Sequence, residues 1–381
     1  MTLALFILLI YAGMMEGYLA DMERNILDLE VGDVQVFAED YRNDPSIYTR
    51  IENTEQVLGP LREAGFPATG RLLGFGLAGS GGSSAGASFR GIDLESDASV
   101  SRVSEEVESG EWLAAGDPKG VVIGRQLARM LDCDLGGELL VLSQGADGAM
   151  AYDLFNVRGI LRGIGAATDR TGIFMLDESF RELMVVPTGV HQIIIRRPGN
   201  VALPLAAERI RGLVGNGRDV QTWQQLLPTL SSMMQSASAA ISVMMVIVYL
   251  AVAILVLNAM LMAVFERVRE FGVLKAVGVS PFDVVWMILI ESAIQAGISI
   301  GVALGLAVPA LVYLTRVGVD IQSLAGVDIM GVAMQPIWRA VMTPSVFAAP
   351  ILTLVAIVSL AVIYPAMKAA WIQPVEAMRH R

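Results

Sequence analysis

The stretch of sequence that decides the fold reads Asn258-Ala-Met-Leu-Met-Ala-Val-Phe-Glu-Arg-Val-Arg-Glu-Phe-Gly-Val-Leu-Lys-Ala-Val-Gly-Val-Ser-Pro281. It begins as the end of a long apolar segment, and charged residues then follow closely, namely Glu266, Arg267, Arg269, Glu270 and Lys275. Phe271 and Leu274 fall on one side of a helix drawn through these charges. Gly278 is placed to end that helix, and Pro281 to open the next one. The pattern predicts a short charged helix between two apolar helices.

Long apolar runs occur at roughly 239–265, 284–315 and 345–367, and a shorter one lies at Met1–Met15. A membrane-spanning helix needs about 20 predominantly apolar residues, so we expect four spans. Charged residues make up only 17% of the 381 residues, whereas soluble domains hold about 25%. The first run lacks the basic flank and cleavage site of a signal peptide. Because it starts inside the predicted span, we expect either a misassigned start codon or a real loss of the lead-in.

The charges are divided unequally. Residues 1–238 carry a net charge of −12, and the rest of the chain carries +1. Cytoplasmic loops are enriched in Lys and Arg, and three basic residues lie at 266–282 and three more at 366–381, against two in the longer loop 316–344. We therefore expect the first two segments in the cytoplasm, and loop 316–344 and the insert between the first two spans outside it.

Composition also excludes some classes of protein. The net charge of −11 argues against a nucleic-acid binder, which needs clustered basic residues to neutralise phosphates. The single cysteine, Cys133, excludes a disulfide-stapled scaffold and is expected to be a small buried thiol.

The insert has the alternating strand and helix signals of an α/β domain. Strands are predicted at 33–37, 120–124, 138–143, 155–161, 172–176 and 191–196, and helices at 55–64, 125–131, 178–184 and 202–214. Both ends of the insert show helical spacing, which predicts stalk helices continuing the spans, with Pro228 as a kink or a start. The glycine-rich segment 79–86 lacks the Lys-Ser/Thr of a phosphate-binding loop, so we expect a mobile loop or hairpin tip. His191 and His380 have no partners at metal-ligand spacing, no G-x-S-x-G is present, and we expect neither a metal site nor a catalytic residue.

Two motifs carry a resemblance to a known family. The first is Glu266-Arg267-x-x-Glu270-Phe271-Gly272-x-Leu274-Lys275-Ala276-x-Gly278, preceded by Asn258-x-Met260-Leu-Met262. The second closes the chain as Pro365-Ala-x-Lys-Ala-Ala-x-x-x-Pro-Val-Glu-Ala-Met378. Together they resemble the FtsX/MacB/Lol superfamily of ABC transporter permeases, most of all the lipoprotein-releasing, LolC/LolE-like subunits. Segments 121–128 and 155–160 resemble its periplasmic domain. The basic elbow that usually precedes the first span of that family is missing.

The resemblance implies a membrane protein with four transmembrane α-helices and a large periplasmic α/β (α+β) domain between the first two. The expected parts are transmembrane helix 1 at 1–20, the periplasmic domain with its first stalk at 21–222, stalk and transmembrane helix 2 at 223–265, a cytoplasmic coupling helix at 266–281, transmembrane helix 3 at 282–315, a periplasmic loop at 316–344, transmembrane helix 4 at 345–367 and a cytoplasmic tail at 368–381.

In that family the coupling helix rests on an ATPase. Carried over to this chain, the contact residues would be Glu266, Arg269, Glu270, Phe271, Leu274 and Lys275, with Gly272 and Gly278 shaping the helix. The motif G-x-x-x-x-G-K-[ST] is absent from the sequence. We therefore expect a non-catalytic subunit without a cofactor of its own, and ATP and Mg bound by a separate, LolD-like ATPase. This departs from MacB, in which the ATPase is fused to the permease.

The spans hold three further sets of candidate residues. Gly297, Gly301 and Gly305 recur every fourth residue, which predicts close helix packing within the bundle or at a permease dimer interface. Glu291 is an intramembrane carboxylate, expected either to act in function or to pair with a basic group at the cytoplasmic end. A substrate cavity could be lined by Met244, Met245, Leu250 and Asn258, and lipid-facing or packing roles are equally open.

The implied function is a permease, working as a homo- or heterodimer in the bacterial inner membrane, that extracts lipoproteins and passes them to a periplasmic carrier for outer-membrane sorting. The segment Asp33-Val-Gln-Val-Phe-Ala38 and the length of the insert favour this group. One alternative is an efflux or peptide exporter with a split ATPase. Another is an FtsX-like mechanotransmitter that regulates cell-wall hydrolases and moves no substrate. An ecto-enzyme is disfavoured, because no catalytic set is found.

Overall fold

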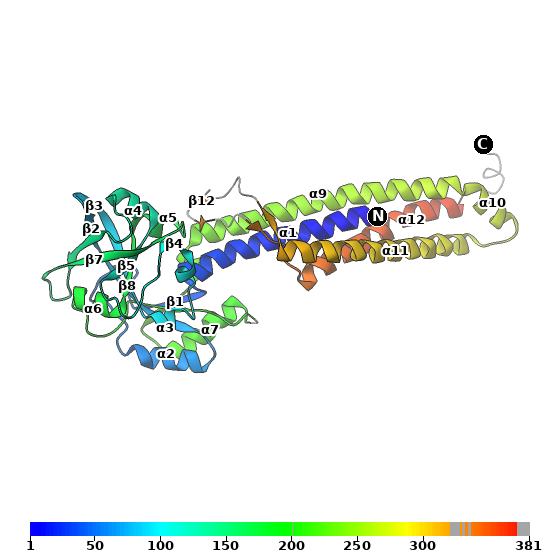
Figure 1. Cartoon of the computed structure of the whole chain (residues 1–381). Helices are drawn as coiled ribbons and strands as arrows, with labels where there is room; N and C mark the ends of the chain where they lie inside the picture. The colour runs from blue at the N-terminus through cyan, green and yellow to red at the C-terminus, as the bar shows by residue number, and fades with distance from the viewer. Residues whose placement is uncertain (200, 321–327, 330–331, 334–336, 372–381) are drawn as a thin grey trace. The chain divides into compact units, whose positions relative to one another are not determined.

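The computed structural model describes residues 1–199, 201–320, 328–329, 332–333 and 337–371 (Figure 1). Four of the described helices are long and apolar enough to cross a membrane, namely α1 (Thr2–Ile26), α9 (Pro228–Glu266), α11 (Pro281–Arg316) and α12 (Pro344–Trp371). Most of their side chains are not buried against the rest of the chain, as suits helices surrounded by lipid. The expected four apolar helices are confirmed, and the chain is a membrane protein.

The described chain forms two compact units. The helical unit contains Met1–Asp21, Met233–Gln322 and Pro336–Arg381, and the α/β unit contains Met22–Ser232 and Ser323–Gln335. The division falls within α1 and within α9, so each of these helices contributes residues to both units.

The core of the helical unit is made of small and branched side chains. Leu5, Leu8 and Leu9 of α1 are buried with residues of the other three long helices and of α10 (Val268–Ala276), namely Val252, Val256, Met260, Phe271, Val284, Ile288, Ala303, Ala307, Leu354, Val358 and Val362. A short ladder pairs β11 (Val319–Asp320) with β14 (Ile337–Trp338). The indole Nε1 of Trp338 donates to the carbonyl of Met14 at 2.9 Å, which ties this ladder to α1. A second pair of short strands, β12 (Asp328–Ile329) and β13 (Val332–Ala333), belongs to the α/β unit.

The α/β unit is built on ten strands, β1 (Val34–Ala38), β2 (Ala68–Ser80), β3 (Ser83–Ile92), β4 (Val107–Gly110), β5 (Gly120–Ile123), β6 (Glu138–Gln144), β7 (Met150–Leu161), β8 (Gly172–Leu176), β9 (Gln192–Ile195) and β10 (Arg218–Thr222). Six of them pair in a closed ring, in the order β2-β3-β8-β5-β7-β6 and back to β2. The inward side chains of this ring, among them Leu72, Phe89, Val121, Phe155 and Ile173, form the core of a small barrel.

Strands β1, β9 and β10 extend the sheet from the other part of β2. β1 follows α1 along the chain and β10 precedes α9, and the two strands pair antiparallel with Val34 opposite Thr222. The connections to both long helices therefore leave the sheet from neighbouring strands.

Eight short helices complete the α/β unit. They are α2 (Thr54–Glu63), α3 (Leu94–Asp97), α4 (Arg125–Leu131), α5 (Ala166–Thr171), α6 (Asp177–Met184), α7 (Leu203–Val214), α8 (Trp223–Leu226) and the 3₁₀ turn η2 (Val103–Glu106), with a π turn η1 (Leu27–Val31) after α1. Each helix and strand expected in the insert has a counterpart here, and Pro228 is the first residue of α9. Cys133 is buried, as expected.

The β2–β3 hairpin is the main element that the sequence did not predict. Gly81 and Gly82 form its turn with φ of +56° and +97°, a conformation that favours glycine. The glycine-rich segment is thus a hairpin tip, but the strands on either side of it are long. Their hydrophobic alternation is hidden because glycine, alanine and serine occupy many positions.

The second half of the closing motif, from Pro374, and His380 lie outside the described residues.

Candidate coupling site

The short charged helix at 266–281 is α10, which lies between α9 and α11 in the helical unit (Figure 1). Arg267, with φ of −106° and ψ of 8°, separates it from α9. At its other end Gly278 has φ of +105°, and the N–H of Val279 donates to the carbonyl of Leu274 at 3.1 Å. Ser280 then caps α11 in a capping box with Asp283, and Pro281 is the first helical residue. The break at Arg267 and the turn at Gly278 therefore make α10 a separate short helix between α9 and α11.

One side of α10 is fixed to the bundle. Phe271 is 5% exposed and packs in the apolar core of the helical unit. Gly272 is also buried, and Leu274 is half-buried against the same core. Phe271 was expected on the surface that contacts a partner, and Gly272 was expected to shape the helix. That assignment of Phe271 is wrong for this structure, because an aromatic side chain at helical spacing from the spans gains more from burial among them than from exposure.

The other side of α10 is open. Glu266, Arg269 and Glu270 are exposed, Lys275 is half-buried, and Gly278 is exposed at the turn. Two apolar residues that the sequence analysis did not select, Val273 and Val277, are exposed on the same short segment. An exposed pair of valines among charged residues is a surface suited to a partner protein. Little in the sequence indicates them, because valines next to an apolar membrane-spanning segment cannot be distinguished from the residues of that segment by composition.

Arg267 joins α10 to α11. Its Nη1 donates to both carboxylate oxygens of Glu291, at 2.7 and 2.8 Å, and its Nε donates to Glu270 at 3.1 Å. The hydrogen bond to Glu270 and the negative charge of Glu291 raise the pKa of Arg267. Of the two roles left open for Glu291, the structure supports pairing with a basic group. Arg267 was part of the sequence motif but was not among the selected site residues.

Glu291 also borders a hollow of about 570 Å³ in the first part of α11, lined by Asp283, Trp286, Met287, Ile290, Glu291, Ile294 and Gln295. The carboxylate therefore lies where apolar and polar side chains meet.

The three glycines of α11 do not pack within the chain. Gly297, Gly301 and Gly305 are exposed, and a Cβ added to any of them would have no described atom within 4 Å. The side of α11 that packs holds Ser292, Ala296, Ala303 and Ala307 instead. The prediction of glycine packing inside the bundle is therefore wrong for the described chain, and a dimer interface stays a prediction.

Close backbone approach occurs at two glycines of α1 that the sequence analysis did not single out. A Cβ on Gly17 would overlap the carbonyl oxygen of Arg339, and one on Gly13 would lie 2.7 Å from a methyl of Leu311. They escaped notice because they stand alone in an apolar run and do not repeat at a fixed spacing along a span.

The four candidate cavity residues are divided between the two sides of α9. Met244, Leu250 and Asn258 are exposed, whereas Met245 is half-buried against the core of the helical unit. A cavity lined by the first three would need a second subunit to close it. In the described part of the chain, no group of three or more His, Cys, Asp or Glu side chains is placed to hold a metal ion.

Comparison with known proteins supports the helical part of this description. Residues 242–374 match the family model described as FtsX-like permease C-terminal. This range takes in α10, α11 and α12 and most of the apolar part of α9. The helical part of the chain from residue 242 is therefore similar to an FtsX-like permease domain, in agreement with the sequence motifs. A search of curated proteins gives no match.

Two solved structures with some similarity to the chain are extracytoplasmic parts of transporters. The periplasmic region of MacB from Actinobacillus actinomycetemcomitans is 11% identical and aligns over 52% of this chain and 92% of its own, with a TM-score of 0.39. The extracellular domain of the noncanonic ABC-type transporter YknZ from Gram-positive bacteria is 11% identical over 50% of this chain and 99% of its own, with a TM-score of 0.35. Scores this low do not establish a common fold.

Proposed function

We propose that the chain is the permease subunit of an ABC transporter of the FtsX/MacB superfamily, and that α10 is the surface on which a separate ATPase acts. One observation carries the proposal. α10 presents Arg269, Glu270 and Val273 outward, next to the exposed Glu266 at the end of α9, while Phe271 anchors α10 in the bundle. A helix held in this way can receive a partner on one side and pass its movement to the spans on the other.

Two connections would carry the movement onward. The ion pair of Arg267 with Glu291 links the start of α10 to α11. The chain then reaches the α/β unit through α1 and α9, which continue into β1 and β10. Because β1 and β10 pair in register over five residues, a displacement of either helix acts on the same sheet.

We propose further that two permease subunits, identical or paralogous, assemble with two ATPase subunits. The glycines of α11 and the outward Asn258 of α9 support this, because neither is explained by packing within the chain. A polar amide such as that of Asn258 is costly when it faces lipid. Polar side chains and regularly spaced glycines are common where membrane-spanning helices pack against one another. ATP and Mg would be held by the ATPase, and this chain would have no catalytic residue.

The substrate we propose is a lipoprotein of the bacterial inner membrane, handed to a carrier on the periplasmic side with a LolD-like ATPase as motor. The basic residues of α10 and the acidic composition of the insert support this orientation. Depleting the protein in cells tests the substrate. We expect outer-membrane lipoproteins to stay in the inner membrane, whereas normal sorting with chained cells would contradict the substrate and favour a regulator of cell-wall hydrolases.

Co-purification tests the coupling surface itself. The double variant E266K/R269E reverses two exposed charges, one at the end of α9 and one in α10, and we expect it to lower the amount of ATPase recovered with the permease. The variant E178K, on the exposed surface of α6 in the α/β unit, is the control and should leave recovery unchanged. Equal recovery from both variants would contradict the assignment of α10.

A further inference from the structure

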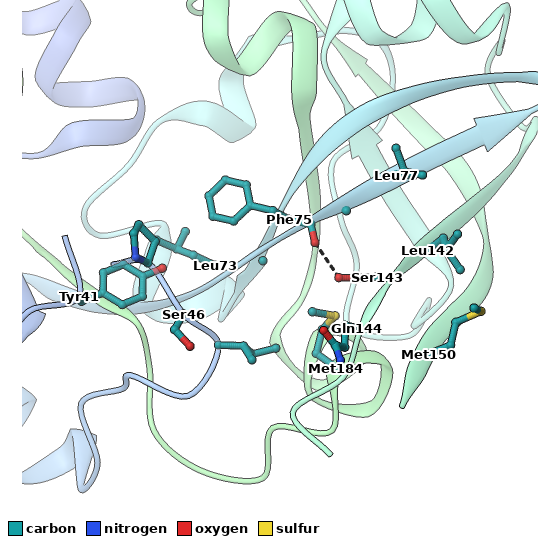
Figure 2. A pocket seen from close by; sticks show the side chains of 14 residues that line it. Tyr41, Ser46, Leu73, Phe75, Leu77, Leu142, Ser143, Gln144, Met150 and Met184 are labelled. Carbon is teal, nitrogen blue, oxygen red and sulfur yellow. Dashed lines mark hydrogen bonds between the residues drawn. The ribbon is translucent and has the colours of Figure 1, made fainter. Parts of the chain in front are cut away.

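An apolar groove lies on the α/β unit, on the outside of the barrel. It has a volume of about 450 Å³ and runs between the segment Tyr41–Ile47 and strands β2 and β6 (Figure 2). Figure 2 shows Tyr41 and Leu73 at one end and Leu77, Leu142 and Met150 at the other, with Phe75 between them. Pockets that take small ligands have volumes of about 300–1,000 Å³ and mainly apolar walls with a few polar groups. This groove has the size and the walls of a ligand site.

The walls carry no charged side chain. The polar side chains that line the groove are Tyr41, Ser46, Ser143 and Gln144, all of them neutral. A second hollow of the same unit, about 730 Å³ in volume, is different, since Arg62, Asp93, Asp177 and Arg181 lie on its walls. The first groove is therefore matched to a long apolar group without charge.

The groove is held in shape by bonds behind its walls. The hydroxyl of Ser143 donates to the carbonyl of Phe75 at 2.6 Å, the dashed line in Figure 2. The N–H of Leu73 donates to Nδ1 of the buried His191 at 3.1 Å, and the other ring nitrogen lies 3.3 Å from the carbonyl of Ile47. His191 thus ties one wall to the other, and the groove is formed without a ligand.

Large apolar side chains surround the groove on the exposed face of the barrel. Phe75 is 63% exposed and Met150 is 72% exposed. The register places Leu77, Leu142 and Tyr152 side by side on β2, β6 and β7, so the apolar surface continues beyond the groove. A contiguous apolar surface outside the membrane-spanning helices is costly in water and marks a binding site.

We propose that this groove binds one acyl chain. Its uncharged walls favour a hydrocarbon over a peptide segment, whose backbone groups need hydrogen-bond partners. Two of the four polar side chains on the walls, Ser143 and Gln144, already donate to carbonyls of the protein itself. Met150 and Met184 line it, and their flexible thioethers adapt to a chain of variable length and bend. Binding gains with each methylene that leaves water, while the head group stays in water at the open side. The inference depends on the α/β unit alone and stands whether or not the transporter moves lipoproteins.

Photolabelling of the full-length chain tests this. The probe is palmitic acid with a diazirine near its methyl end, added to the protein in phosphatidylcholine nanodiscs, and the labelled residues are mapped by mass spectrometry. We expect label within 73–77 and 142–150, in addition to label on the apolar helices. The variant L77E/M150E changes two exposed positions, so the fold is retained, and it should lower label in these two segments about tenfold, as a loss of about 1.4 kcal/mol in binding would.

The matched control is L205E/M130E, which places the same charges on equally apolar positions, 46% and 48% exposed, away from the groove. It should label like the unmodified chain. Unlabelled palmitate, a lysophospholipid and a triacylated lipopeptide are then added as competitors, and the one that displaces the probe identifies the source of the acyl chain. Label confined to the apolar helices, or equal label in L77E/M150E and its control, would overturn the proposal, as would displacement by an unacylated apolar peptide alone.

Discussion

Arg267 donates to both carboxylate oxygens of Glu291, at 2.7 and 2.8 Å, although 24 positions separate the two residues in the sequence. Arg267 stands at the break between α9 and α10, and Glu291 lies inside α11. The pair therefore joins three helical segments at one point. It also gives a carboxylate in an apolar span the opposite charge that such a group requires.

Breaking this pair should impair coupling more than stability. We expect E291Q to lower ATP-driven substrate release by the reconstituted complex, while ATP binding by the partner is unchanged, because the variant removes the charge that holds Arg267. The neutral amide of glutamine has nearly the same size as the carboxylate and costs less in an apolar span, so the thermal unfolding midpoint of the chain should barely change. The swap R267E/E291R should restore part of the lost release. Failure of the swap together with a large drop in the unfolding midpoint would assign the pair a purely structural role.

Phe271 is predicted to hold α10 on the bundle. Replacing it with alanine removes a buried aromatic side chain, and such changes cost about 3–5 kcal/mol. We expect F271A to lower thermal stability and to weaken ATPase binding at the same time, measured by unfolding in detergent and by co-purification. V273E changes an exposed position of the same helix and should weaken ATPase binding with no loss of stability. If F271A left both quantities unchanged, α10 would not be anchored through this residue.

The glycines separate packing within the chain from packing between chains. G17A should destabilise the helical unit, because the new methyl overlaps the backbone at Arg339, and overpacking of this kind costs about 1–3 kcal/mol. G301A meets no described atom within 4 Å and should leave the stability of the single chain unchanged or raise it by up to about 1 kcal/mol. The larger change G301L should shift the assembly from dimer to monomer in native mass spectrometry. An unaltered dimer would remove the glycines of α11 from the interface.

His191 predicts a dependence of stability on pH. Burial lowers the pKa of its imidazole from 6.5 to about 4, and its Nδ1 accepts the N–H of Leu73, a bond that protonation destroys. Because the folded pKa lies below the unfolded one, the unfolded state takes up the proton first, and the free energy of unfolding falls as the pH drops from 6.5 towards 4. The full effect is about 3 kcal/mol.

Chemical unfolding of the full chain in detergent, followed by tryptophan fluorescence from pH 7 to pH 4, measures this effect. Carboxylates also titrate in the range, so the comparison is with H191N, whose side-chain oxygen can still accept from Leu73. We expect H191N to lose about 3 kcal/mol less than the unmodified chain between the two ends of the range. Parallel curves for the two proteins would show that His191 does not titrate on unfolding.

Hydrophobic spacing along the chain predicted those helices and strands whose formation depends on neighbouring residues. The helix α4 was expected at the residues where it occurs, because Leu127, Ala128 and Leu131 repeat at helical spacing. The strands β2 and β3 were missed because glycine, alanine and serine occupy many of their positions and hide the hydrophobic alternation. The barrel itself depends on the pairing of β2 with β6, which lie about 60 residues apart, and no short-range pattern records such a contact.

The candidate site was predictable in part for the same reason. The motif from Glu266 to Gly278 located α10 and its ends, because charge and glycine placement are local signals. Which side of α10 faces the bundle depends on how the helices pack, and the burial of Phe271 was therefore missed. The spacing of the glycines of α11 left two directions open, into the bundle or towards a second subunit, and the structure excludes only the first for the described chain.

Cross-linking from α10 tests the central claim, that this helix is the surface on which an ATPase acts. A cysteine is introduced at the exposed Val273 in a chain carrying C133A, and the complex is treated with a short bifunctional reagent with and without a non-hydrolysable ATP analogue. The account predicts a cross-link to the ATPase whose yield changes with the nucleotide, and none from a cysteine at the exposed Leu306 of α11. Cross-links to the ATPase from position 306 and none from position 273 would contradict it.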